Sequence, residues 1–170
     1  MIVGNYETRS VFDVDLATGN RFLVSGASRG TGPALPPVLD LVILQDESII
    51  VSTRYFDSFP YTNSLFRIDP LTGNRTLIST DNYGDWEYER IALGSNGQLL
   101  ASVPGKDAIY SVDPLTGQRT LITGNGYGTG PQLFWGDMVV LPMPEPTAFY
   151  LFAIGAAAMM SFRRKLARSC

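Results

Sequence analysis

The stretch LFRIDPLTGNRTLIS, residues 65–79, decides the fold because it occurs three times in the chain. It returns as VFDVDLATGNRFLVS at residues 11–25 and as IYSVDPLTGQRTLIT at residues 109–123. The central aspartates of the three copies, Asp15, Asp69 and Asp113, lie 54 and 44 residues apart. Self-similarity at a period of this size indicates a protein that is built from repeated structural units.

Each copy predicts a β-hairpin. In the second copy, Phe66 and Ile68 alternate with their neighbours at the period of two that is typical of a strand. In the turn that follows, aspartate can accept hydrogen bonds from the backbone after it, proline presets φ, and glycine supplies a left-handed residue. The predicted turn residues are Asp15 and Gly19; Asp69, Pro70 and Gly73; and Asp113, Pro114 and Gly117.

A second hairpin is predicted ahead of the second and third copies. Residues 41–44 turn into residues 49–52, and residues 91–93 turn through Asn96-Gly97 into residues 98–102. Four antiparallel strands in about 44 residues are typical of one blade of a β-propeller. We therefore predict an all-β fold, a partial β-propeller of four-stranded antiparallel blades over residues 1–142. Its predicted parts are a partial blade at 2–25, blades at about 38–80 and 88–124, and a last strand at about 132–141.

The predicted number of blades is smaller than the four to eight of a typical propeller. We expect either a truncated N-terminal end, which would leave the set of blades open, or an assembly of several copies into a larger ring. The chain opens MIVGNYETR, without the basic and apolar regions of a signal peptide. The repeats resemble the broad class of extracellular propellers with DP-x-TG-x-R turns, among them NHL-like and lactonase-like forms.

The last 28 residues, 143–170, form a segment of different composition. Residues 147–162 carry no charge and would reach roughly 24 Å as a helix, against about 30 Å for a hydrocarbon core. Arginines behind this run could snorkel toward the headgroups. We predict a single transmembrane helix with a cytoplasmic C-terminus. The alternative is a buried helix of a soluble domain, which would normally show a wider polar face.

Two short motifs flank the apolar run. Pro144, Glu145 and Pro146 precede it, and Arg163, Arg164, Lys165 and Arg168 follow it. This order resembles the PEP-CTERM sorting signal of certain Gram-negative bacteria. The resemblance implies recognition by exosortase, cleavage near the motif, and passage from the inner membrane to the cell surface or an extracellular matrix. An unprocessed tail-anchored membrane protein is the alternative.

Composition excludes several classes of function. The net charge is −3, yet four of the 13 basic residues lie in the last eight positions, so the remainder is strongly acidic. Such a surface argues against a nucleic-acid partner. The chain has no histidine, and its one cysteine is Cys170. This excludes Cys/His zinc sites, internal disulfides and His-dependent catalytic pairs, so we predict neither catalytic residues nor a cofactor.

Three loops are candidate sites. Residues 22–32 look like the cofactor loop of short-chain dehydrogenases, but the prolines that follow forbid the helix this loop needs, so we interpret it as an inter-blade loop. Residues 81–89 hold four carboxylates, with calcium binding as the weaker interpretation beside a solvated acidic loop. Aromatic residues on two loops are predicted ligand contacts, unless they cap a blade end: Tyr55, Phe56, Tyr61, Tyr83 and Trp86.

These observations lead to two hypotheses of function. The first is a non-enzymatic, exported surface or matrix protein that contacts exopolysaccharide or envelope proteins. The second is a metal-dependent, lactonase-like hydrolase, for which only Asp40 and Asp137 lie near suitable positions. The aligned arginines are expected to bridge neighbouring blades through the aligned aspartates: Arg21, Arg75 and Arg119.

Overall fold

The computed structural model describes residues 1–55, 62–82, 90–103, 106–124 and 126–129. Strands account for most of these ranges, as the alternating and β-branched sequence predicts. They are β1 (Ile2–Asn5), β2 (Ser10–Val14), β3 (Arg21–Ser25), β4 (Val38–Ile43), β5 (Ile49–Tyr55), β6 (Thr62–Ile68), β7 (Arg75–Asn82), β8 (Ile91–Leu93), β9 (Leu99–Val103), β10 (Ala108–Val112) and β11 (Arg119–Gly124).

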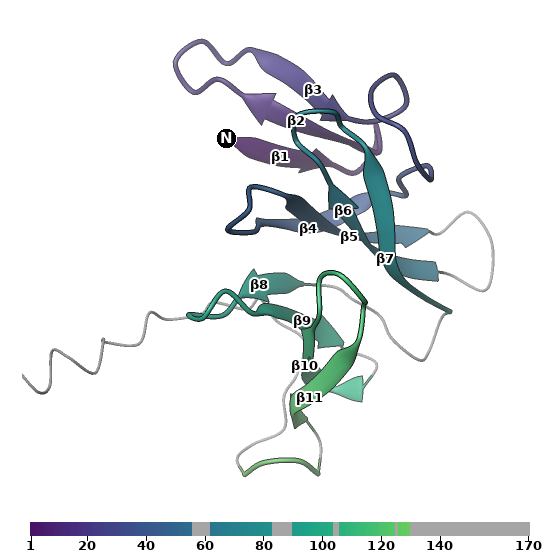
Figure 1. The fold of residues 1–170 in the computed structure, drawn as a ribbon, viewed down its shortest axis with the longest axis vertical. Coiled ribbons are helices and arrows are strands. Elements are labelled where there is room, and N and C mark those ends of the chain that lie inside the picture. The colour runs from purple at the N-terminus through teal and green to yellow at the C-terminus, as the bar shows by residue number, and fades with distance from the viewer. Residues whose placement is uncertain (56–61, 83–89, 104–105, 125, 130–170) are drawn as a thin grey trace, which may run out of the picture. The chain divides into compact units, whose positions relative to one another are not determined.

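The strands pair into three small antiparallel sheets (Figure 1). The first sheet is β1-β2-β3, the second is β4-β5-β6-β7, and the third is β8-β9-β10-β11. Within each sheet, every strand pairs with the strand that follows it in the sequence, so each sheet is a meander of hairpins. The repeated stretch forms the last hairpin of each sheet: β2-β3, β6-β7 and β10-β11.

The structure corrects the predicted fold class, which was a partial propeller with a transmembrane helix. What the described residues form is three separate sheets of three, four and four strands, because only one strand precedes the first repeat copy. In the part of the chain that the structure describes, no helix is long and apolar enough to cross a membrane. The predicted span 147–162 lies outside the described residues, as does the whole of the segment 141–170.

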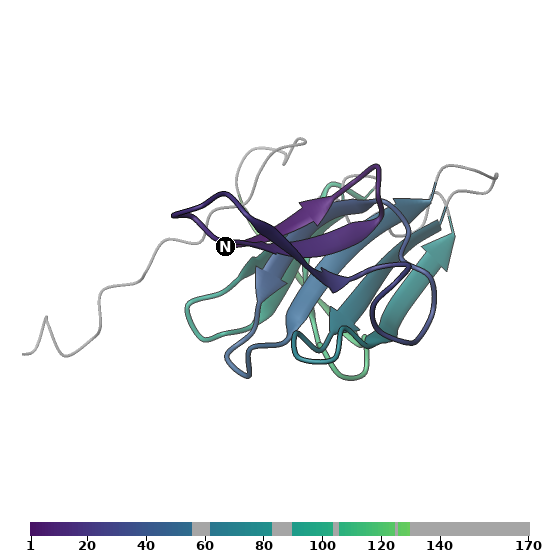
Figure 2. The ribbon, with the colours of Figure 1, turned by 90° about the horizontal axis from the view of Figure 1, so that it is seen from above.

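The second sheet shares a hydrophobic core with each of the other two. The first core joins Val11 and Val24 of the first sheet to residues of the second, among them Ile49 and Val51. In Figure 2 the purple β1–β3 sheet lies against the blue strands of the second sheet, as this shared core requires. Ile50 belongs to the other core, with residues of β8, β9 and β10. Strand β5 is therefore buried on both faces, which explains its continuous apolar run.

The last hairpin of each sheet carries a β-bulge at the same position. The registers shift between Val11 and Phe12, between Leu65 and Phe66, and between Ile109 and Tyr110. One residue of the last strand is left unpaired at each shift: Val24, Ile78 and Ile122. Val24 is buried in the first core, and Ile78 packs against the second core.

Candidate functional site

The turn at Asp69 is held by hydrogen bonds to its own aspartate. The Leu71 N–H donates to Asp69 Oδ1 at 2.9 Å, and the Thr72 hydroxyl donates to Oδ2 at 2.7 Å. The Gly73 N–H donates to the Asp69 carbonyl at 2.8 Å, and Gly73 has a φ of 76°. A non-glycine residue would be strained in this left-handed conformation.

The turns at Asp15 and Asp113 repeat this arrangement. Ala17 N–H and the Thr18 hydroxyl donate to Asp15, and the backbone N–H groups of Leu115 and Thr116 donate to Asp113. These hydrogen bonds lower the pKa of all three aspartates. The largest cause is the threonine hydroxyl at Asp15 and Asp69, and the backbone N–H of Leu115 at Asp113. All three carboxylates are therefore ionised at neutral pH.

A polar hollow lies beside the turn in the second and third sheets. The first hollow has a volume of about 280 Å³ and is lined by Asp46, Ser48, Arg67, Asp69, Pro70, Asn74 and Thr76. The second has about 260 Å³ and is lined by Gly97, Gln98, Leu99, Ser111, Val112, Asp113, Pro114, Gln118 and Thr120. The strand registers make Ser111 the counterpart of Arg67 and Gln98 the counterpart of Ser48, so these are two versions of one site.

The two hollows differ in charge. In the second sheet, Arg67 Nη2 forms an ion pair with Asp46 Oδ2. The Ser48 hydroxyl donates to Asp46 Oδ1 at 2.6 Å, and this bond, more than the Arg67 charge, lowers the pKa of Asp46. In the third sheet a neutral contact takes this place, in which Gln98 Nε2 donates to Ser111 Oγ at 2.6 Å. The charged version is the candidate ligand site.

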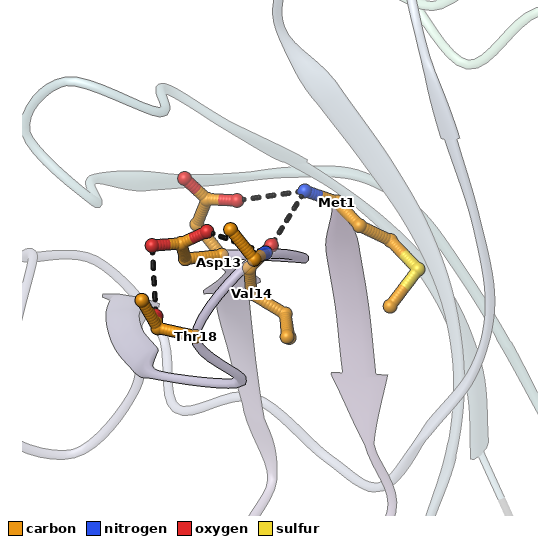
Figure 3. Close-up of polar contacts among 6 residues, drawn as sticks. Met1, Asp13, Val14 and Thr18 are labelled. Carbon is orange, nitrogen blue, oxygen red and sulfur yellow. Dashed lines mark hydrogen bonds and ion pairs between the residues drawn. The ribbon is translucent and has the colours of Figure 1, made fainter.

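The first sheet carries a third variant of the same position. Asp13, the counterpart of Arg67, pairs with the ammonium group of Met1 at 3.0 Å, and the ammonium also donates to the Val14 carbonyl (Figure 3). Figure 3 also shows the hydroxyl of Thr18 on the carboxylate of the adjacent turn. Both partners of the ion pair are about half exposed, so solvent screens their attraction. The turn and its flanking strands are thus the same in the three sheets, while the charged groups beside the turn differ.

Several predicted residues cannot be placed. Tyr55 ends β5, and its side chain is not described. The remaining aromatic candidates, the sorting motif and the basic cluster lie outside the described residues: Phe56, Tyr61, Tyr83 and Trp86; Pro144, Glu145 and Pro146; Arg163, Arg164, Lys165 and Arg168. The ligand and sorting roles of these residues stay predictions, as does calcium binding at 81–89.

Asp40, the candidate metal ligand, has a structural contact. Its Oδ1 accepts the Leu41 N–H at 2.8 Å, and its Oδ2 accepts the Ile91 N–H at 2.9 Å. The carboxylate therefore joins β4 to the start of β8. Asp137 lies outside the described residues, and the described ones contain no group of three side chains that could hold a metal ion.

The aligned arginines contact acceptors that the sequence did not indicate. We expected them to bind the aligned aspartates. Arg75 instead donates to carbonyl oxygens of the loop after β3: Nε to Pro33 at 2.8 Å, and Nη1 to Gly26 at 3.1 Å and to Arg29 at 3.0 Å. Nη1 also donates to the hydroxyl of Ser25 at 3.0 Å. We call this set of contacts the Arg75 latch, and it binds the second sheet to the first.

Comparisons with known proteins give only distant structural matches to this chain. No protein-family model and no curated protein matches the chain. Among solved structures, a protein of Bacteroides uniformis, provisionally assigned as a 6-phosphogluconolactonase, has 17% identity, a TM-score of 0.46, and coverage of 72% of this chain and 37% of its own. A protein of Bacteroides fragilis with the same assignment has 18% identity, a TM-score of 0.43 and the same coverage. A protein of Lactobacillus plantarum has 16% identity, a TM-score of 0.41, and coverage of 71% and 37%.

The chain thus spans little more than a third of the structures it matches. The predicted description of this chain as a propeller with a membrane helix is corrected for the described part, which forms three antiparallel sheets and holds no helix long and apolar enough to cross a membrane.

Proposed function

We propose that the chain is a non-catalytic binding module and that the Asp46–Arg67 hollow contacts a small, neutral, hydroxyl-rich ligand such as a sugar. The proposal rests on the ion pair between Asp46 and Arg67, which lies beside a hairpin that all three sheets repeat. Arg67 forms an ion pair with Asp46 in the second sheet, whereas its counterpart in the third sheet, Ser111, forms a neutral contact with Gln98, the counterpart of Ser48. Variable groups on a fixed scaffold are the usual design of a recognition surface.

The lining of the hollow suits a neutral ligand. Arg67 offers donors only, while the carboxylates of Asp46 and Asp69 offer acceptors only. A hydroxyl group both donates and accepts, so neighbouring hydroxyls of a sugar can bind both kinds of group. Two carboxylates against one guanidinium disfavour an anionic ligand.

The same carboxylates are poorly suited to catalysis. The pKa values of Asp46 and Asp69 are both lowered, chiefly by hydrogen bonds from Ser48 and Thr72. A carboxylate whose pKa lies far below the working pH is a weak base and cannot donate a proton, whereas general acid–base catalysis needs a pKa near that pH. This supports binding over proton transfer in the hollow.

Metal-dependent lactone hydrolysis is the second candidate, and it is the one to which the assignments of the two structural neighbours point. In this chain both oxygens of Asp40 accept backbone N–H groups. These bonds use one acceptor site on each oxygen and fix the carboxylate between β4 and β8, which gives it a structural role of its own. We therefore place this candidate second.

A titration of the ¹⁵N-labelled protein with neutral mono- and disaccharides tests the first candidate. We expect shifts confined to residues 46–48, 67–76 and their neighbours. The Arg67→Ser variant, which copies the third sheet, should raise the dissociation constant about tenfold or more. Ser111→Ala in the third sheet is the matched control and should leave it unchanged. Saturable shifts that persist in Arg67→Ser, or shifts centred elsewhere, would refute the assignment of the hollow.

A rate measurement separates the two candidates. Hydrolysis of a sugar lactone would be followed by acid release, with divalent metal added and after chelation. The binding proposal expects no rate above the spontaneous one. A metal-dependent rate that falls in an Asp40→Asn variant would favour the hydrolase instead.

A further inference from the structure

The side chain of Asn74, which lines the Asp46–Arg67 hollow, is held in one orientation by Thr31. The Thr31 N–H and the Thr31 hydroxyl both donate to Asn74 Oδ1, at 2.8 and 2.9 Å. A backbone N–H can only donate, so this contact fixes which end of the amide is the oxygen. The end that remains for a further partner is Nδ2, which forms no hydrogen bond with the described residues.

Thr31 lies in a Gly-Thr-Gly-Pro sequence, and close backbone packing fixes its position. Its carbonyl accepts the Arg75 N–H at 2.8 Å, so the connection between β3 and β4 runs along β7. Gly30 has a φ of 83°, and an added Cβ would overlap the Gly73 carbonyl oxygen. Gly32 has a φ of 105°, and an added Cβ would overlap the Arg75 carbonyl oxygen. Glycine on both sides allows this close approach, which holds the two donors of Thr31 in place.

The other polar groups of the hollow are already engaged. Both carboxylate oxygens of Asp69 accept hydrogen bonds from its own turn. Asp46 Oδ1 accepts from Ser48, and Asp46 Oδ2 pairs with Arg67. Nδ2 of Asn74, in contrast, carries two N–H donors that no described residue accepts. Because its orientation is set in advance, this amide can bind a ligand atom with little further loss of conformational entropy.

We propose that Asn74 Nδ2 donates to the ligand of the hollow and that Thr31 is the residue that positions it. This inference rests on the proposed function and adds a requirement for specificity. The ligand has to place an acceptor atom, such as a hydroxyl or ring oxygen of a sugar, against the amide. A ligand that presents only donors there is rejected, because the amide hydrogens are left without a partner. A segment outside the second sheet thereby contributes to the site of that sheet.

Asn74→Asp separates the ligand contact from the contact to Thr31. One carboxylate oxygen can accept both Thr31 donors as Oδ1 does, whereas the other replaces the N–H donors with an acceptor. With glucose, galactose and maltose as probes, the dissociation constant should rise about tenfold or more. Gln118→Glu makes the same chemical change at the counterpart of Asn74 in the third sheet and is the matched control. It should leave the constant unchanged.

Two variants of Thr31 test the positioning. Thr31→Val removes the hydroxyl donor and keeps the backbone N–H, whereas Thr31→Ser keeps both donors. We expect a dissociation constant about threefold higher for Thr31→Val and close to the wild-type value for Thr31→Ser. The side-chain NH₂ resonances of Asn74 report the contact directly. In the wild type they should shift saturably, with the same dissociation constant as the backbone of residues 46–48.

The outcomes separate this inference from the proposed function. A wild type that binds none of the three saccharides overturns both. Binding at the hollow that survives Asn74→Asp, or that leaves the Asn74 NH₂ resonances unmoved, overturns the role of Asn74 and keeps the proposed function. A Thr31→Ser variant that binds no better than Thr31→Val overturns the role of the hydroxyl. Circular dichroism of each variant, recorded first, shows that it is folded.

Discussion

The three turn aspartates couple the local backbone to protonation. In each turn, the carboxylate oxygens accept hydrogen bonds from the residues two and three positions further along the chain. At Asp69, for example, the donors are Leu71 and Thr72. Ionised oxygens are stronger acceptors than those of a protonated carboxyl group. The turn is therefore most favourable when its aspartate carries a charge.

The lowered pKa values set the sign of the pH dependence. A carboxyl group with a lower pKa in the folded state stabilises that state at pH values above its ordinary pKa, about 3.9. This contribution is lost as the pH falls through the lower, folded-state pKa. We expect the urea midpoint of the wild type to fall below about pH 4. Asp69→Asn should have a lower midpoint than the wild type at pH 7, and the difference should vanish at low pH. A constant difference across that range would contradict this account.

At the scale of single elements, the Arg75 latch explains how β7 is fixed to the loop before β4. One guanidinium donates to the carbonyls of Gly26, Arg29 and Pro33 in the connection between β3 and β4, where Gly26 and Arg29 also bond to each other through their backbones. Polar backbone groups in such a loop are costly to leave unpaired. Arg119, the counterpart in β11, likewise donates to the hydroxyl of Ser79 on β7. The contact to the serine near the end of the preceding sheet's last strand thus recurs, at Ser25 for Arg75 and at Ser79 for Arg119.

Removing the latch should destabilise the protein. Arg75→Ala leaves the Pro33 carbonyl without its donor and removes one donor each from Gly26 and Arg29, which keep their mutual backbone bonds. We expect a loss of about 1–3 kcal/mol in the free energy of unfolding. Arg21→Ala is the matched control, because Arg21 has the same place in the first repeat but no hydrogen bond within the described residues. Urea unfolding should show no change for it. Equal losses for the two variants would show that the guanidinium contacts add nothing.

At the scale of the whole described body, the second sheet connects two cores. Neighbouring residues of β6 point to opposite faces, so Leu65 belongs to the core with the third sheet and Phe66 to the core with the first. In repeat architectures, stability is close to a sum of unit and nearest-neighbour terms. Damage to one core should therefore spread mainly to the sheet that shares it.

Hydrogen exchange can show which sheet loses protection when one of the two cores is damaged. Leu65→Ala should speed the exchange of β8–β11 more than that of β1–β3, and Phe66→Ala should do the reverse. Global losses of about 2–5 kcal/mol are expected for each truncation. Val42→Ala, a partly buried residue at the rim of the second core, should show a smaller effect with the direction of Leu65→Ala. Uniform loss of protection in both variants would mean that the three sheets unfold as one unit.

The sequence predicted those features that are local. Aspartate, threonine and glycine within five residues are enough to specify the turn at Asp69, and alternation is enough to specify the strands beside it. The acceptors of Arg75 lie 42 to 50 residues away and are mostly backbone carbonyls, which have no signature in a sequence. The Asp46–Arg67 pair depends on the register of β5 and β6. The transmembrane helix was predicted from an uncharged run and the arginines that follow it; the described residues contain no such helix, and residues 147–162 lie outside them.

The recurrence of Gly-Thr-Gly-Pro at 30–33 and 128–131 has a genetic consequence. Both copies end a sheet and introduce the next segment, so DNA exchange between misaligned alleles at these codons would delete or duplicate the intervening 98-residue block. The duplication would join the third sheet to a second copy of β4–β7 by a sequence that already joins two sheets of this protein. Unequal crossing-over could thereby change the length of this protein in steps of two sheets without inventing a connection.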